Sequence, residues 1–386
     1  MYNLILIRYG EIALKGDNRG TFEELLFRRL EQALAAVGDA RVVRAWGRMY
    51  VENAKPADVI PAISRVFGVV SFSPAVRTEN DLAQIAAAAV AVAGEHKAAG
   101  SFKIEARRAL KSFPYTSLEL NRLVGSAVQE AFPTLPVDLQ KPDFTIYVEV
   151  RPEGSFVYSE VIPGPGGLPV GASGHALLLI SGGIDSPVAG WLAMKRGIRL
   201  AGVHFHSYPY TSPKAQDKVI DLFRVLARWG GPLDLYMGYF TRIQEAIEDV
   251  VPERLHITVM RRMMLRLAEA IARETHALAL VTGESIGQVA SQTLESMQVI
   301  GQATGMNILR PVVTMDKAEI TVLARQIGTF DISSRPYEDC CTLFVPRHPA
   351  TKPRLSDAQE AEARMPVDDL VKEAIARTEK LVIAPE

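Results

Sequence analysis

Hydrophobic and polar residues follow a regular pattern in the second half of the chain. Short apolar runs there are separated by longer stretches in which apolar residues recur every three or four positions, which predicts strands alternating with amphipathic helices. Strands are expected at residues 176–180, 199–205, 233–239, 277–282 and 307–312, and helices at 187–196, 215–229, 241–250, 257–275, 291–301 and 317–327. This alternation predicts an α/β fold with a doubly wound parallel sheet, in which ligands bind at the carboxyl ends of the strands.

The first half of the chain differs, because its helices and strands do not alternate strictly. Residues 1–73 are expected to form one small α+β domain, and residues 74–165 a second. Their strands are expected at the N-terminus and near 50–51, 102–106, 145–150 and 156–160, and their helices at 21–37, 57–67, 82–93 and 117–132. A stretch rich in Pro and Gly predicts a linker at 166–174 before a third domain at 175–386. After residue 350 we expect one helix and a frayed end.

Composition narrows the class of protein. With 48% hydrophobic and 23% charged residues among 386, the chain is typical of a soluble globular protein. It begins without the features of a signal peptide, and no apolar run approaches the ~20 residues of a membrane span, so we expect a cytoplasmic protein without membrane contact. Its two cysteines, Cys340 and Cys341, are neighbours, which excludes a disulfide framework and fits a reducing compartment.

The segment SGGIDS at residues 181–186 comes directly after one predicted strand and just before a predicted helix. Its glycines are expected to turn the chain with positive φ and, together with the hydroxyls and the helix N-terminus, to bind pyrophosphate. The binding residues would be Ser181, Gly182, Gly183 and Ser186. The loop lacks the Walker A lysine, so it favours cleavage of ATP between the α- and β-phosphates over transfer of the terminal phosphate. The alternative is an ordinary Gly-Gly turn between a strand and a helix.

Loops after the other strands provide further candidates, because the carboxyl ends of parallel strands converge. An apolar ring and main-chain groups at strand ends can hold and read an adenine, and a polar Gly-rich loop at 282–292 suits the ribose and α-phosphate. The residues concerned are Leu179, Ile180, His204, Phe205, Gly283 and Gln292. The alternative for His204, taken alone, is a packing role.

Charged residues near these loops complete the predicted nucleotide site. Arg261 and Lys317 are the expected cations on the phosphates, since charge gathers there in the transition state. Arg261 lies in a helical run, where a surface arginine is the ordinary alternative. Asp185 is expected to hold Mg²⁺ that arrives with ATP, or to organise the loop, because a carboxylate facing a polyphosphate needs a cation between them. No metal site formed by the protein alone and no tightly bound cofactor are expected.

A basic patch in the second predicted domain is the candidate contact for RNA. The formal net charge of the whole chain is only −1, so nucleic acid must be bound by a local patch. Cations for phosphates lie there beside the rings of Phe113 and Tyr115, which suits single-stranded RNA. The patch consists of Lys103, Arg107, Arg108 and Lys111. An edge strand with a solvated basic face is the alternative.

The cysteine pair predicts sulfur chemistry. A disulfide between Cys340 and Cys341 is disfavoured, because Cα atoms one trans peptide apart lie ~3.8 Å from each other and relaxed disulfides need at least ~4.4 Å. Adjacent thiols on a loop near an adenylating site favour sulfur transfer, in which one cysteine carries a persulfide. The alternative is a packing role, since free cysteine is often buried and inert.

Several segments together resemble the tRNA 4-thiouridine synthetase family, the tRNA sulfurtransferases that are also linked to thiamine biosynthesis. The similar segments span most of the chain and lie at 8–16, 105–114, 181–187, 282–293 and 338–342. The resemblance implies a ferredoxin-like domain, a THUMP domain that binds tRNA and a C-terminal PP-loop domain. It also implies that Asp185 and Lys317 are essential for adenylation, and that ATP lies against Leu179, Ile180, His204, Phe205, Arg261, Gly283 and Gln292.

The resemblance further implies a reaction and partners. Uridine 8 of tRNA would be adenylated at O4 with release of pyrophosphate, and a persulfide on Cys340, favoured over Cys341 by its spacing from Lys317, would then supply sulfur and expel AMP. A cysteine desulfurase would donate the sulfur, a sulfur-carrier protein for thiazole synthesis is a further partner, and a homodimer is expected. Some family members carry a C-terminal rhodanese domain. Only a few dozen residues follow Cys341 in this sequence, which is too few for such a domain.

Two other classes of protein stay open at this point. One is an amidating PP-loop synthetase, which would need neither the cysteines nor the region before Pro163. The other is a non-catalytic RNA-binding protein with a decayed nucleotide site, against which the presence of Asp185 and Lys317 argues.

Overall fold

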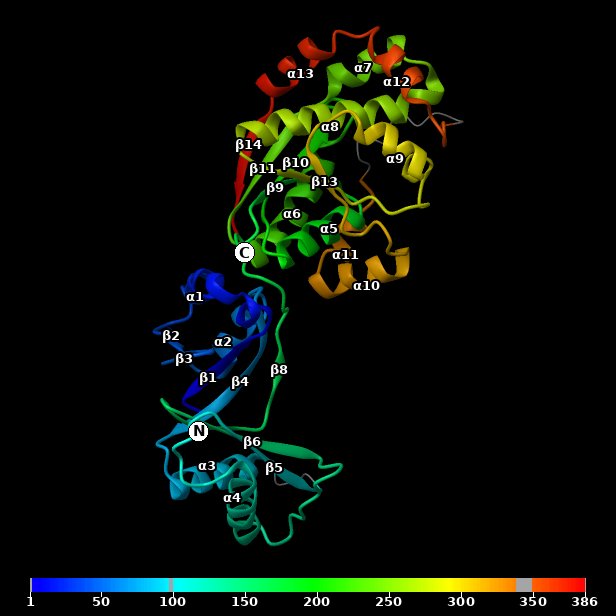
Figure 1. The fold of residues 1–386 in the computed structure, drawn as a ribbon. Coiled ribbons are helices and arrows are strands. Elements are labelled where there is room, and N and C mark those ends of the chain that lie inside the picture. Colours follow the sequence, from blue (N-terminus) through cyan, green and yellow to red (C-terminus); the bar gives the residue numbers. More distant parts are fainter. Residues whose placement is uncertain (1, 97–99, 338–348, 386) are drawn as a thin grey trace. The chain divides into compact units, whose positions relative to one another are not determined.

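A computed structural model describes residues 2–96, 100–337 and 349–385 of the chain (Figure 1). The chain divides into two units, Met1–Pro169 and Val170–Glu386, and each is described by itself. Cys340 and Cys341 lie outside the described residues. No helix in the described ranges is both long enough and apolar enough to cross a membrane.

The first unit is built on an eight-stranded sheet. Seven of its strands follow the order β2-β3-β1-β4-β7-β6-β5, and the eighth, β8, pairs with β4. The strands are β1 (Leu4–Tyr9), β2 (Arg41–Ala45), β3 (Arg48–Glu52), β4 (Val69–Thr78), β5 (Phe102–Arg108), β6 (Phe144–Arg151), β7 (Gly154–Tyr158) and β8 (Ile162–Pro163). The helices are α1 (Arg19–Leu34), α2 (Pro56–Ile63), α3 (Leu82–Glu95) and α4 (Ser117–Ala131). The sequence pattern predicted all four helices and missed β2, β4 and β8.

Strand β4 joins the two halves of this sheet. Its residues Val69–Ala75 pair with β1, and Val76–Thr78 pair with β7. The boundary expected after residue 73 therefore falls inside a strand. Sequence reasoning missed strand β4 because the run Ser-Phe-Ser-Pro at 71–74 is typical of a turn.

A buried carboxylate in β6 gathers three arginines in the first unit. Glu149 contacts the guanidinium groups of Arg8, Arg48 and Arg151 at 3.4, 3.4 and 3.1 Å, and it accepts a hydrogen bond of 2.8 Å from Tyr158. Burial alone would raise the pKa of Glu149, but the arginines and the tyrosine hydroxyl hold it below its usual value. The carboxylate thus neutralises part of a dense positive charge that strands from both halves bring together.

The second unit contains a six-stranded sheet with the order β13-β12-β9-β10-β11-β14. The strands are β9 (His175–Leu179), β10 (Arg199–His206), β11 (Leu233–Tyr239), β12 (Ala279–Val281), β13 (Asn307–Leu309) and β14 (Glu379–Ile383). All pairings among the five strands from β9 through β13 are parallel, as the alternating pattern predicted. The order reverses between β9 and β12, so the loops after these two strands diverge there and leave room for a ligand.

Helices cover both faces of this sheet. α5 (Asp185–Lys195) and α6 (Pro213–Gly230) pack on one face, and α7 (Thr241–Val250), α8 (His256–Glu274) and α13 (Val367–Ala376) lie on the other (Figure 1). The remaining helices are α9 (Leu294–Gly301), α10 (Lys317–Ile327), α11 (Phe330–Ser333) and α12 (Leu355–Glu362). With both faces covered, the parallel strands are buried, which explains their continuous apolar runs.

The C-terminal segment corrects one expectation. In place of a single helix and a frayed end, the described residues after 350 form α12, α13 and β14, and β14 pairs antiparallel with β11. Glu362 of α12 is buried and binds Arg262 of α8 through two hydrogen bonds, of 2.7 and 2.8 Å. The segment is therefore fixed to the domain by a buried bidentate ion pair, whose two members are 100 residues apart in sequence.

Replacing the buried Glu149 should destabilise the first unit. Glu149→Gln leaves Arg8, Arg48 and Arg151 without their carboxylate, and breaking a buried ion pair in this way typically lowers the free energy of unfolding by about 3 kcal/mol. Urea unfolding at neutral pH, followed by circular dichroism, measures this loss. Glu130→Gln, at an exposed position on α4, is the matched control.

The same substitution should change the acid sensitivity of the protein. A carboxylate whose pKa is lowered on folding stabilises the folded state above its unfolded pKa, near 4.5, and the contribution is lost as the pH falls through the folded pKa. Wild type and Glu149→Gln should therefore converge in acid. Equal stability of the two proteins at neutral pH would contradict the assignment.

Candidate functional site

The loop between β9 and α5 is braced by its own two serines. The backbone N–H of Ser181 donates to Ser186 Oγ at 2.9 Å, and the Ser186 hydroxyl donates to the Ser181 carbonyl at 3.2 Å. Helix α5 begins at Asp185, and its N-cap residue, Ile184, makes no side-chain capping bond. The first N–H groups of α5 are thus left for a ligand, and a helix N-terminus of this kind favours an anion.

The glycines of this loop do not have the conformation that the sequence predicted. Neither Gly182 nor Gly183 is among the residues with positive φ, so that expectation is wrong. α5 begins earlier than expected, and Ile184 already has helical angles of φ −73 and ψ −33, so the chain passes into the helix without a left-handed turn. A Cβ at Gly183 would meet only Ser181 Oγ, at an ordinary 3.4 Å, so the protein itself leaves space there.

Gly283, after β12, does need to be glycine, because a Cβ there would lie 2.6 Å from the backbone nitrogen of Ser186 and 2.8 Å from the carbonyl carbon of Asp185. The expected close approach at Gly283 therefore exists within the protein, between two pieces of backbone. It sets the loop after β12 directly against the first turn of α5.

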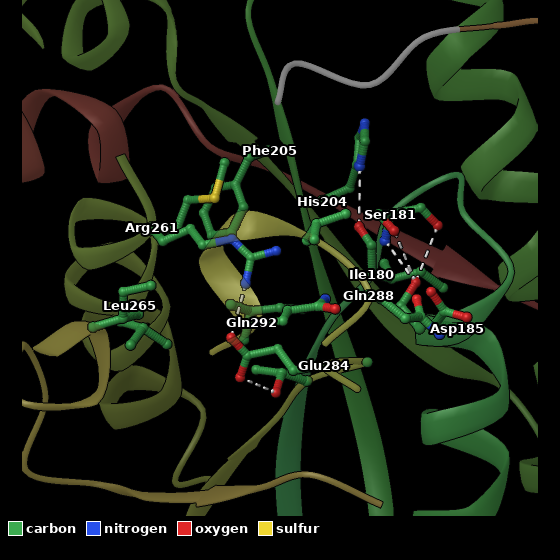
Figure 2. A pocket seen from close by; sticks show the side chains of 17 residues that line it. Ile180, Ser181, Asp185, His204, Phe205, Arg261, Leu265, Glu284, Gln288 and Gln292 are labelled. Carbon is green, nitrogen blue, oxygen red and sulfur yellow. Dashed lines mark hydrogen bonds and ion pairs between the residues drawn. The ribbon is translucent and has the colours of Figure 1, made fainter. Parts of the chain in front are cut away.

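A pocket of about 300 Å³ opens at the carboxyl ends of β9, β10 and β12 (Figure 2). It brings together most of the residues predicted for the nucleotide: Leu179, Ile180, Ser181, Asp185, Ser186, His204, Phe205, Arg261, Gly283 and Gln292. Gly182, Gly183 and Lys317 are not among the lining residues. The loop predicted at 282–292 also contributes Thr282, Glu284, Gln288 and Val289 to the lining. Sequence reasoning did not single out Met264, Leu265 and Ile300, which line the pocket as well.

The walls of the pocket combine an apolar part with fixed polar groups. Leu179, Phe205 and Leu265 offer apolar surface of the kind that an aromatic base needs. His204 is buried, and its Nδ1 lies 3.1 Å from the carbonyl oxygen of Ile180 (Figure 2), so the ring nitrogen donates to that carbonyl. His204 thus both packs between neighbouring strand ends and lines the pocket.

Glu284 holds two arginines at the pocket. Its carboxylate is buried and contacts Arg261 at 2.8 Å (Figure 2) and Arg310 at 2.7 Å. It also accepts a 3.0 Å hydrogen bond from Thr282 Oγ1. Arg261 is therefore no ordinary surface arginine, since its guanidinium is fixed at the pocket wall. The sequence analysis included Glu284 only as a member of the loop at 282–292 and did not name Arg310. The two ion pairs could not be predicted, because the paired residues are 23 and 26 positions apart and no motif connects them.

Lys317 and Asp185 form an ion pair. Their Nζ and Oδ1 atoms are 2.9 Å apart although the residues are separated by 132 positions in sequence. Lys317 is the first residue of α10, and a capping box formed by Asp316 and Glu319 caps the N-terminus of this helix. The two charged residues that the sequence predicted for one site are thus brought together beside the phosphate loop.

Two side-chain amide atoms of pocket residues have unsatisfied hydrogen-bonding capacity in the described part of the chain. Gln288 Nε2 and Gln292 Oε1 are buried, and neither has a hydrogen-bond partner within the described part of the chain. One is a donor and the other an acceptor, and unsatisfied buried groups are rare enough to need an explanation. A polar ligand in the pocket would satisfy both.

The predicted RNA patch is only partly available as expected. Arg108 donates to the carbonyls of Phe113 and Tyr115 at 2.9 and 3.3 Å, and Phe113 is buried, so this ring cannot stack on a base. Lys103 and Arg107 both contact Glu105, at 3.7 and 3.0 Å. The side chain of Arg107 is nevertheless 74% exposed, and Lys111 is exposed as well.

The described chain passes the phosphate loop just before the cysteine pair. Ser333 Oγ donates to the Gly183 carbonyl at 3.1 Å, and Lys218 Nζ donates to the carbonyls of Arg335 and Tyr337 at 3.0 and 3.4 Å. In the residues that the structure covers, no group of three or more His, Cys, Asp or Glu side chains could hold a metal ion.

Comparisons with known proteins agree with this architecture. The family model "Thiamine biosynthesis protein (ThiI)" matches residues 171–367, "ThiI ferredoxin-like domain" matches 4–73 and "THUMP domain" matches 79–160. Probable tRNA sulfurtransferases from Moorella thermoacetica and Halothermothrix orenii are each 50% identical, over 100% and 99% of this chain and 99% of their own. A crystal structure of a 4-thiouridine synthetase with RNA and bound ATP superposes with a TM-score of 0.91 at 39% identity, covering 99% of this chain and 100% of that one. The chain therefore belongs to the ThiI family of tRNA sulfurtransferases.

Proposed function

We propose that this protein is an ATP-dependent tRNA sulfurtransferase, which converts uridine 8 of tRNA to 4-thiouridine with release of pyrophosphate and AMP. One observation carries the proposal: a phosphate loop without a Walker lysine opens into an apolar pocket that also contains a fixed arginine and two unpartnered amide atoms. The family and the relatives named above support the same activity.

ATP fits the pocket in one orientation. The adenine packs on the apolar wall of Leu179 and Phe205, and the phosphates lie on the loop and the uncapped N-terminus of α5. Arg261, held by Glu284, and Lys317 then stabilise the negative charge that develops on the α-phosphate and the departing pyrophosphate. The space left by Gly183 lets the phosphates approach the backbone closely.

Mg²⁺ belongs to the nucleotide in this proposal. Asp185 is a single carboxylate, which fits a cation held mainly by phosphate oxygens and water, as Mg²⁺ usually is. The bound ion would neutralise charge between the phosphates. Asp185 is then its protein ligand, and Lys317, which binds the same carboxylate in the structure, is free to turn to the phosphates.

The reaction follows in two steps. Uridine O4 attacks the α-phosphate, the bond to the bridging oxygen breaks, and pyrophosphate leaves. The terminal sulfur of a persulfide on Cys340 or Cys341 then attacks C4 and expels AMP. An external thiol reductant opens the sulfur–sulfur bond, which releases 4-thiouridine and leaves that cysteine in a mixed disulfide with the reductant, since a disulfide between the two neighbouring cysteines is disfavoured. Adenylation is needed because a carbonyl oxygen is a poor leaving group and AMP is a good one.

The partners follow from this chemistry. tRNA is bound by the first unit, and Lys103, Arg107 and Lys111 stay candidates for its phosphates. A cysteine desulfurase as sulfur donor, a sulfur-carrier protein for thiazole synthesis, a homodimer and a cytoplasmic location also stay predictions from the sequence.

Removing the Asp185–Lys317 pair should stop adenylation. Lys317→Met and Asp185→Asn should each lower the rate of tRNA-dependent pyrophosphate release by ~100-fold or more, because each removes a charge from the reacting phosphates. Lys372→Met, at an exposed position on α13, is the matched control. Normal release by both variants would contradict these roles, and formation of ADP by the wild type would contradict the proposed reaction.

Sulfur transfer should require the cysteine pair. Cys340→Ser with Cys341→Ser should retain pyrophosphate release and form no 4-thiouridine, because the substitutions remove the atom that carries sulfur and leave the nucleotide pocket unchanged. Mass spectrometry of nucleosides from digested tRNA measures the product. Each single variant identifies which thiol is essential. Full thiolation by the double variant would exclude the persulfide mechanism.

A further inference from the structure

Aromatic rings are kept out of water almost everywhere in this protein, and two of the exceptions share one loop. Among the described residues, only three aromatic side chains are in the exposed class: Trp46 at 82%, Tyr208 at 56% and Tyr210 at 52%. Trp46 lies in the first unit. Tyr208 and Tyr210 follow β10 directly, at the carboxyl edge of the sheet that also forms the nucleotide pocket.

The backbone that carries these two rings is fixed. Ser207 and Thr211 close the loop, because the N–H of Thr211 donates to the Ser207 carbonyl at 3.0 Å and the N–H of Ser207 donates to Thr211 Oγ1 at 3.1 Å. Thr241 Oγ1 donates to the Tyr208 carbonyl at 2.8 Å. These hydrogen bonds hold the backbone of the loop, so its conformation does not depend on burying the rings of Tyr208 and Tyr210, and both rings are exposed.

The loop lies between the two places that the reaction must connect. On one side, β10 supplies His204 and Phe205 to the nucleotide pocket. On the other, Lys214 and Lys218 of α6 contact the chain that leads to the cysteine pair: Lys214 Nζ lies 5.8 Å from the centre of the Tyr337 ring, and Lys218 binds the Tyr337 carbonyl.

A hollow of about 310 Å³ adjoins Tyr208, and its lining suits a base. Tyr208 shares it with His206, Tyr239, Arg377 and Glu379. The Arg377 guanidinium contacts Glu373 at 3.5 Å and lies 3.5 Å from the centre of the Tyr239 ring. Burial lowers the pKa of His206 to about 4, so this ring is uncharged at neutral pH. The hollow therefore offers flat rings with a cation at its edge.

We propose that Tyr208 and Tyr210 form a stacking platform for unpaired bases of the tRNA that carries the target uridine, and that the hollow beside Tyr208 takes one of these bases. The inference rests on the proposed function. A base that is modified must leave its stack, and exposed rings on a fixed loop replace the stacking that it loses.

RNA fits this surface better than a protein partner does. Rings that lie beside cations are the usual elements of single-strand recognition, and Lys214 and Arg377 provide the cations here. Both residues also follow β10 at the end of the sheet where the nucleotide pocket opens, which is where the target uridine must meet the α-phosphate.

Binding of a labelled, unmodified tRNA transcript, followed by fluorescence anisotropy, tests the platform. Tyr208→Ala and Tyr210→Ala should each raise the Kd for tRNA by roughly 10-fold, as expected for one lost stacked base. Tyr208→Phe and Tyr210→Phe keep the ring and should stay within about twofold of wild type if stacking is the contact. The dependence of Kd on salt should not change, because no charge is removed.

Controls separate this inference from its alternatives. Leu278→Ala removes an apolar side chain that is 71% exposed and directly precedes β12, at the amino ends of the strands of the same sheet. This variant should leave tRNA affinity unchanged. ATP affinity should be the same in every variant. Unchanged tRNA affinity in both alanine variants would overturn the platform, and slower persulfide loading by a desulfurase alongside it would assign the rings to a protein partner.

Formation of 4-thiouridine by the wild type is measured in parallel. Its absence would remove the proposed function, whereas the anisotropy series reports on the surface independently of any turnover. The two hypotheses therefore fail through different measurements.

Discussion

A contact between two pieces of backbone, the approach of Gly283 to the first turn of α5, constrains the second unit. A single methyl group at this position would lie 2.6 Å from the Ser186 nitrogen, so the loop after β12 and the phosphate loop fit together only through bare backbone. The same contact places Thr282 and Glu284 beside the pocket, and Glu284 in turn fixes Arg261 and Arg310. The position of the charged wall thus depends on a glycine that needs no contact with a ligand.

Helix α8 distributes neighbouring arginines between two tasks. Arg261 turns to Glu284 at the pocket, and Arg262 is buried with Glu362 of the C-terminal segment. Met263 and Met264 fill the core around them. The pocket wall and the last part of the chain are therefore held by consecutive residues of one helix, which explains why a charged pair occurs in a helix that is otherwise mostly buried.

The sequence predicted the second unit well, because alternation of apolar runs and amphipathic stretches is a strong and repeated signal. β11, α7 and α10 begin and end at the predicted residues. β14 was missed, since Glu379 to Ile383 is a short edge strand that contains charge and gains its structure from pairing with β11. β4 was missed because Pro74 interrupts the apolar pattern in a strand that is nevertheless central.

The site was predicted as far as strand ends and motifs determine it. The loop at 282–292 was predicted, but the individual roles of Glu284 and Gln288 and the contribution of Arg310 were not, because a residue's place in a tertiary ion pair or at a pocket wall leaves no local pattern. The positive φ angles expected for Gly182 and Gly183 failed for a related reason. Where a helix begins depends on what its first turn packs against, and here Gly283 packs against Asp185 and Ser186.

The pairing of Lys317 with Asp185 has a consequence for the empty enzyme. Because ammonium and carboxylate satisfy each other at 2.9 Å, neither charge projects freely toward passing ions. In the proposed function, a nucleotide that arrives with its metal would engage both members at once, Asp185 through the metal and Lys317 through the phosphates. On the proposed function, the pair therefore holds both charges in place beside the phosphate loop until the nucleotide and its metal arrive.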